Sequence, residues 1–146
     1  PGQHPAELIT DTETESLRAT SGSTYRDNYM FRLAETYLLR AEAYLGKGNL
    51  IDAANDINVV RSRANANPVD PADVTLDYIL DERARELVYE EPRRITLHRT
   101  GKLVERVRKY NTLNKDEIQD YHSLWPIPYS FIEANKNAVI EQNPGY

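Results

Sequence analysis

The chain has 146 residues, of which 40% are hydrophobic and 28% are charged, and its formal net charge is -5. These values predict one globular domain with a real hydrophobic core, and the acidic balance offers no basic surface for a nucleic-acid partner. The absence of cysteine excludes disulfides, thiolate catalysis and cysteine-bearing zinc sites.

The start of the chain is polar and contains many threonines and serines, a composition that is typical of loops. We therefore expect an irregular leader over residues 1–28, the remnant of a longer protein. The remaining residues, 29–146, are predicted to form a helical domain.

From Tyr29 onward, apolar residues recur every three or four positions. This spacing predicts a helix over 30–46, which the glycines of the stretch 46–49 end. A second helix is predicted over 50–64, antiparallel to the first. The pair has about the length of a tetratricopeptide unit, and its small residues, such as Ala41, would let two helices approach closely. An ordinary helical hairpin is the alternative, and the periodicity does not distinguish the two.

A third helix is predicted over 75–91, with Thr75 as its N-cap and Pro92 ending or kinking it. A fourth should cover 95–110 with an interruption near Gly101. The following segments are a polar loop over 111–123, an extended stretch over 124–128 and a short helix over 129–134. The predicted fold class is all-α, with tetratricopeptide-like helical hairpins, extended loops and a C-terminal tail.

The first helix is predicted to be apolar on more than one face. A helix that is apolar nearly all round needs cover on nearly all sides. The rest of the chain supplies only part of that cover, so we expect more exposed apolar surface than a monomer usually has.

Acidic and basic residues are interleaved along the predicted helices. A glycosidase also needs two carboxylates, held across the scissile bond, but helix-borne carboxylates among arginines favour structural ion pairs. The residues expected in such pairs are Arg32, Glu35, Glu42, Arg61, Arg63, Glu82, Arg83 and Glu86. No nucleotide-binding or nucleophile motif is present. We therefore expect that the protein has no catalytic residue, binds no cofactor and is not an enzyme.

The aromatic residues suggest candidates for ligand contact, because tyrosine and tryptophan offer a flat apolar face and a polar edge. Tyr25, Tyr121 and Trp125 are predicted in or near loops and are the candidates. Trp125 directly precedes a Pro-Ile-Pro segment, where it is either a structural plug or a sugar platform. The three histidines are scattered, so no metal site is expected.

No apolar run approaches the roughly 20 residues that cross a bilayer. No basic region followed by an apolar run opens the chain. We therefore expect this chain to carry neither a membrane anchor nor a signal peptide of its own.

Six motifs follow one another in a recognisable order. They are Arg32–Ala43 (RLAETYLLRAEA), Asn58–Ala64 (NVVRSRA), Ile79–Leu87 (ILDERAREL), Arg99–Lys102 (RTGK), Pro126–Pro128 (PIP) and Gln142–Tyr146 (QNPGY). Together, over residues 29–146, they resemble the C-terminal part of the SusD/RagB family.

One segment departs from the family pattern. The family usually has EGxRWxDL after the third helix, and here Glu91 stands for the glycine, Arg94 for the tryptophan and Thr96 for the aspartate. Family members are also several-fold longer and carry a lipidated cysteine. This chain therefore resembles a C-terminal piece or a truncated relative.

The resemblance implies a glycan- or nutrient-binding component of a TonB-dependent import system. Such proteins bind oligosaccharides, cap a SusC-like transporter barrel and face outward from the outer membrane, anchored by lipid in the full-length protein. This chain would be the C-terminal scaffold part. The alternative is a tetratricopeptide-like scaffold that docks a protein partner and binds no sugar.

Overall fold

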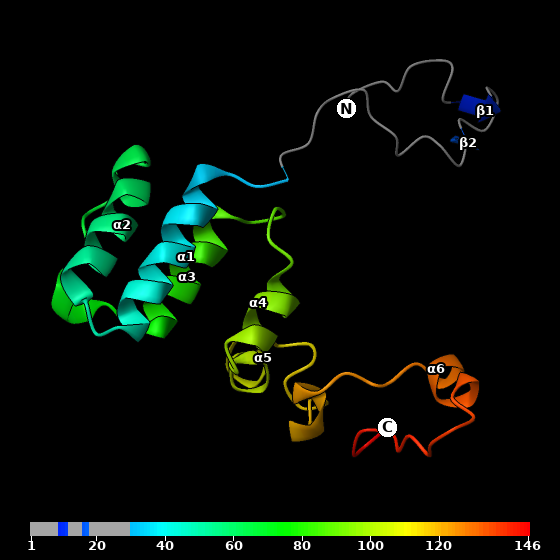
Figure 1. The fold of residues 1–146 in the computed structure, drawn as a ribbon. Helices are drawn as coiled ribbons and strands as arrows, with labels where there is room; N and C mark the ends of the chain where they lie inside the picture. Colours follow the sequence, from blue (N-terminus) through cyan, green and yellow to red (C-terminus); the bar gives the residue numbers. More distant parts are fainter. Residues whose placement is uncertain (1–8, 12–15, 18–29) are drawn as a thin grey trace.

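The structure is a computed structural model that describes residues 9–11, 16–17 and 30–146 (Figure 1). Its described part is helical, as predicted, apart from one short antiparallel pair of strands near the start. The pair consists of β1 (Ile9–Asp11) and β2 (Ser16–Leu17), with Ile9 opposite Leu17. The polar composition of the leader did not predict this pairing. The domain boundary at residues 28 and 29 stays a prediction.

The helical elements are, in chain order, α1 (Leu33–Gly46), α2 (Leu50–Arg63), the 3₁₀ helix η2 (Pro71–Asp73), α3 (Leu76–Glu86), α4 (Arg93–Arg99), α5 (Leu103–Tyr110), the 3₁₀ helix η3 (Asp120–Ser123) and α6 (Tyr129–Ala134). The predicted spans for the first, second and last of these α-helices agree with the structure to within three residues. Over the residues that the structure describes, no helix is both long and apolar enough to span a membrane.

The helices α1 and α2 form a hairpin closed by a three-residue connection (Figure 1). Gly48 takes a φ of +74° in that connection, which favours glycine over residues with a side chain. The side chain of Asn49 then caps α2 by accepting a hydrogen bond from the amide of Asp52 at 3.3 Å. The hairpin prediction is confirmed, whereas its tetratricopeptide-like character stays a prediction.

The main core lies among α1, α2 and α3. Its buried residues are Leu38, Ala41, Ala53, Ala54, Ile57, Val60, Val69, Val74, Ile79 and Leu87. Three of them are alanines on facing parts of the hairpin, so the two backbones pack closely there. A smaller core of Leu80, Leu97 and Leu103 joins α3 to α4 and α5.

The start of α1 remains apolar and uncovered among the described residues. Met30, Phe31 and Leu33 are all exposed. These residues expose apolar surface at the N-terminal end of the first predicted helix, and the expectation of more such surface than a monomer usually has stays a prediction.

The helix α3 begins as predicted and ends early. The Thr75 hydroxyl accepts from the amide of Tyr78 at 3.1 Å, the hydrogen bond of an N-cap. The helix stops at Glu86 instead of running to residue 91, because the guanidinium of Arg32 donates to the Glu86 carbonyl at 2.8 Å. In a continuing helix, that carbonyl would accept from the amide of Glu90. The Glu90 amide donates to the Leu87 carbonyl instead. The resulting turn brings Glu91 back to α3.

The predicted interruption near Gly101 is confirmed. Gly101 has a φ of +68°, and the amide of Lys102 donates to the Leu97 carbonyl at 2.8 Å, so α4 ends there before α5 begins.

The C-terminal tail is built differently from the body. Among the described residues, none after Arg106 is buried. The segment 124–127 runs beside 142–146 because side chains clamp it. Gln142 accepts from the Ile127 amide and donates to its carbonyl, both at 2.8 Å. Figure 1 shows the tail leaving the helical body, forming α6 and turning back.

Candidate ligand pocket

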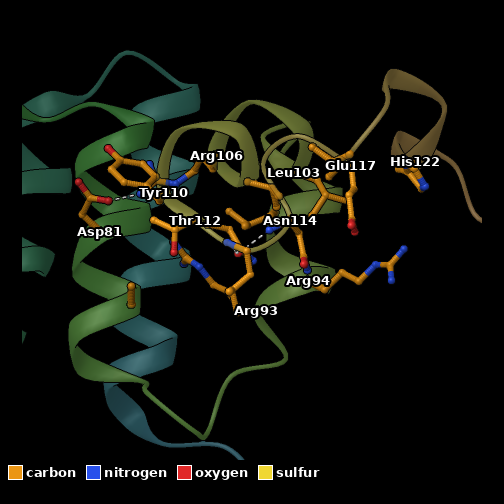
Figure 2. A pocket seen from close by; sticks show the side chains of 16 residues that line it. Asp81, Arg93, Arg94, Leu103, Arg106, Tyr110, Thr112, Asn114, Glu117 and His122 are labelled. Carbon is orange, nitrogen blue, oxygen red and sulfur yellow. Dashed lines mark hydrogen bonds and ion pairs between the residues drawn. The ribbon is translucent and has the colours of Figure 1, made fainter.

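A cavity of about 860 Å³ opens between α3, α4, α5 and the turn that follows α5 (Figure 2). This volume falls in the range of small-molecule pockets. The helix α3 contributes Asp81, α4 contributes Arg93 and Leu97, and α5 contributes Leu103 and Arg106. The floor is therefore apolar, and the charged groups come from three separate helices.

The other wall is the turn over residues 110–118. The side-chain oxygen of Asn111 accepts from the amides of Leu113 and Asn114, at 3.0 and 3.1 Å, and so fixes the turn. Tyr110 and Thr112 line the pocket from the same turn. The pocket therefore has polar and aromatic side chains on one wall and an apolar floor.

Arg106 is a satisfied cation in this pocket. Its guanidinium donates to Asp77 at 2.7 Å and also to Asp81. Burial lowers the pKa of Arg106, but the hydrogen bonds that it donates to Asp81 and Asp77 outweigh that effect and raise its pKa overall. Both carboxylates thus pair with this arginine, and Asp77 also lies 3.8 Å from the Lys102 amine.

Arg93 has a less complete environment. Its nearest carboxylate is Glu91, at 3.6 Å, and Glu91 accepts a hydrogen bond from Arg83 at 2.9 Å. Within the described part of the chain, Nη1 of Arg93 is buried and has no hydrogen-bond partner. Burial lowers the pKa of Arg93, and the charges of Arg106 and Arg83 lower it further against the opposing effect of Glu91.

Trp125 lies against the rim of this pocket. The guanidinium carbon of Arg94 sits 4.2 Å from the centre of the Trp125 ring, a cation–π contact, and the ring of His98 is 5.9 Å away. Trp125 remains 46% exposed. Arg94 is the residue that stands where the family usually has tryptophan. The structure therefore shows one contact face and one open side, and the choice between plug and platform stays open.

The other aromatic candidates differ from Trp125. Tyr121 packs edge-on against Tyr146, with ring centres 5.2 Å apart, and a Cβ at position 145 would collide with its ring. Gly145 has a φ of +92°, so a side chain there would be strained as well. Tyr121 thus lies in a packing contact of the tail. Tyr25 lies outside the described residues.

The carboxylates singled out from the sequence lie in ion pairs. Arg83, whose side chain is 2% exposed, binds Glu35 at 3.0 Å and Glu91 at 2.9 Å. Glu42 binds Arg99, which belongs to α4. The Arg83 contacts tie α1 and the turn after α3 to α3, and the Glu42–Arg99 pair ties α1 to α4.

Further ion pairs join α2 to α3. Glu82 accepts from Arg61 at 2.7 Å, and Glu86 accepts from Arg63 at 2.8 Å. Arg32 reaches the same Glu86 at 2.9 Å from the start of α1. We propose a structural role for all eight residues, because each contacts an opposite charge on another helix or segment.

The sequence analysis missed Arg93 and Arg106 as pocket residues. The available signal was the pair of arginines directly after Pro92, which has no acidic residue three or four positions further along the helix to neutralise it. As for metals, the described ranges contain no group of three His, Asp or Glu residues placed to hold an ion.

Comparison with known proteins gives a consistent result. The model of the SusD family matches residues 9–146. The chain is 39% identical over 137 residues to a starch-binding protein, SusD, of Bacteroides thetaiotaomicron, an alignment that covers 88% of this chain and 24% of the relative. It is 31% identical over 131 residues to SusD-like protein P38 of Formosa agariphila, covering 80% of this chain and 24% of that relative. The matched region thus spans about a quarter of each relative. No solved structure matches the chain significantly.

Proposed function

The chain belongs to the SusD family, and from that premise we propose that it is the C-terminal scaffold part of a glycan-binding protein. The observation that carries the proposal is the 39% identity to a relative named a starch-binding protein. A pocket with an apolar floor and polar walls supports it, because sugars present both apolar ring faces and hydroxyl groups.

The proposal extends to location and partner. A SusD-family protein of this kind would act at the outer membrane, anchored by lipid and facing outward, beside a SusC-like TonB-dependent barrel that imports the bound oligosaccharide or other nutrient. The role is binding without chemical conversion. It is supported by the ion pairs that engage Glu35, Glu82 and Glu86, the carboxylates singled out from the sequence.

Glycan binding is tested with the full-length gene product. We expect retardation in native gels that contain a polysaccharide, measured over a panel that includes starch and acidic and neutral plant and algal glycans. Retention of at least one glycan, without release of reducing ends, is the expected result. If no glycan of the panel retards the protein, the proposal is wrong.

The transporter partner is tested separately. We expect the gene beside this one to encode a TonB-dependent barrel, and we expect the two proteins to co-purify when they are produced together. If the neighbouring barrel does not co-purify in detergent, the partnership fails while glycan binding can still stand.

A second function has one observation in its favour. The exposed residues Met30, Phe31 and Leu33 at the start of α1 form apolar surface of the kind that packs against protein. A tetratricopeptide-like scaffold that binds a protein and no sugar would use such a surface. Polar substitution of Phe31 that abolishes partner binding, in a protein that retains no glycan, would favour this alternative.

A further inference from the structure

The pocket contains a buried arginine nitrogen that is only loosely paired within the described residues, since Nη1 of Arg93 lies 3.6 Å from Glu91 and has no hydrogen-bond partner. Glu91 also binds Arg83 through its other oxygen at 2.9 Å, and Asp81 binds Arg106, so neither carboxylate belongs to Arg93 alone. Glu117 also lines the pocket, but Figure 2 shows its side chain apart from that of Arg93. Binding of an anion would stabilise Arg93, because burying a cation without a full partner raises the free energy of the folded protein.

We propose that this pocket binds an acidic sugar residue whose carboxylate pairs with the guanidinium of Arg93. The inference rests on the proposed glycan-binding function and adds the class of glycan. A carboxylate is favoured over a point-like anion because the guanidinium is planar and offers parallel donors that match two coplanar oxygens.

The remaining lining suits a sugar ring and not a free anion alone. Leu97 and Leu103 supply apolar surface, and Tyr110 supplies an aromatic ring whose centre lies 4.9 Å from the Arg106 guanidinium. Thr112 and Asn114 bring side chains able to bond hydroxyl groups. A small acid such as acetate would leave most of this surface uncovered.

The test compares each acidic oligosaccharide with its own carboxyl-reduced form. The probes are oligogalacturonate, oligomannuronate and hyaluronan oligosaccharides, measured by isothermal titration calorimetry on the full-length gene product, with maltotetraose as a neutral glycan. We expect at least one acid to bind about tenfold or more tightly than its reduced counterpart, the effect of one charge-assisted hydrogen bond.

Three variants assign that preference to Arg93. Arg93→Gln should remove the difference between acid and reduced form. Arg93→Lys keeps the charge but loses the planar fork, and should retain only part of the preference. Arg85→Gln is the matched control, because Arg85 is an exposed arginine on α3 outside the pocket, and it should keep the full preference. Circular dichroism verifies that each variant is folded. If Arg93→Gln does not fold, the partial loss of preference in Arg93→Lys is the test.

The outcomes separate this inference from the function on which it rests. If the protein binds maltotetraose or a reduced oligosaccharide as tightly as every acid, the acidic ligand is wrong and glycan binding stands. Equal loss of preference in Arg93→Gln and Arg85→Gln would mean a general charge effect and would overturn the assignment to Arg93. If no oligosaccharide of either kind binds, the proposed function itself fails.

Discussion

The helical body and the C-terminal tail of this protein are held together by different interactions. In the body, α1, α2 and α3 bury a core of aliphatic side chains and connect their edges through buried arginine–carboxylate pairs. In the tail, none of the described residues is buried after Arg106, and single side chains clamp the backbone instead. One short chain can therefore combine a cooperative unit with a segment whose stability is local.

The largest expected effect is at the buried arginine of the body. Arg83→Gln should lower the free energy of unfolding by about 3–5 kcal/mol, because Glu35 would lose its partner and Glu91 would keep only its looser pair with Arg93 in a buried site. Urea denaturation followed by circular dichroism measures the change. Arg85→Gln, which removes an exposed arginine, should cost less than about 1 kcal/mol. Equal losses in the two variants would show that burial of the pair does not matter.

Truncation in the core should have the next largest effect. Leu38→Ala removes a fully buried side chain and should cost about 2–5 kcal/mol in the same denaturation experiment. The matched change in the tail is Val139→Ala, at a side chain that is 92% exposed, and it should alter stability by no more than about 0.5 kcal/mol. A tail variant as costly as the core variant would break the distinction between the two regions.

The clamp of the tail gives a smaller and more local effect. Gln142→Ala removes both hydrogen bonds to Ile127 and should cost about 1–3 kcal/mol locally, since a partly buried backbone amide loses its partner. Hydrogen exchange at the Ile127 amide should accelerate while the unfolding midpoint of the body stays the same. Asn137→Ala, at an exposed amide residue of the tail, is the control. A fall in the midpoint of the body would show that the two regions unfold together.

The smallest effect is expected at the end of the chain. Tyr146→Phe deletes the hydroxyl that donates to the Leu124 carbonyl at 3.0 Å and should cost about 0.5–1.5 kcal/mol, again only within the tail. The double variant with Gln142→Ala tests whether the two tail contacts depend on each other. Coupling between the two substitutions in hydrogen exchange indicates one cooperative clamp, and strict additivity indicates independent contacts.

Local chemistry made much of the body predictable. The helical spacing of apolar residues located α1 and α2, Thr75 marked the start of α3, and Gly101 marked the break between α4 and α5. Each of these depends on residues within a few positions of one another. The end of α3 was not predictable in this way, because the group that binds its last carbonyl is Arg32, 54 residues earlier.

The candidate pocket was less accessible to sequence reasoning for the same reason. Arg106 is satisfied by Asp77 and Asp81 on α3, partners that its own sequence neighbours do not reveal, whereas for Arg93 the local sequence offered only the missing acidic residue further along its helix. The sequence identified Arg94 only as a departure from a family pattern. Its contact with Trp125 became visible once the tail was placed beside α4.

Arg32 also has a mechanical consequence. It directly precedes α1, and its side chain binds Glu86, the last residue of α3, and Glu90 in the turn that follows. Tension applied through the chain before Met30 therefore reaches α3 through that guanidinium as well as the first turn of α1. The load is shared between two helices that lie side by side, a shear arrangement in which several bonds must break together before either helix begins to unravel.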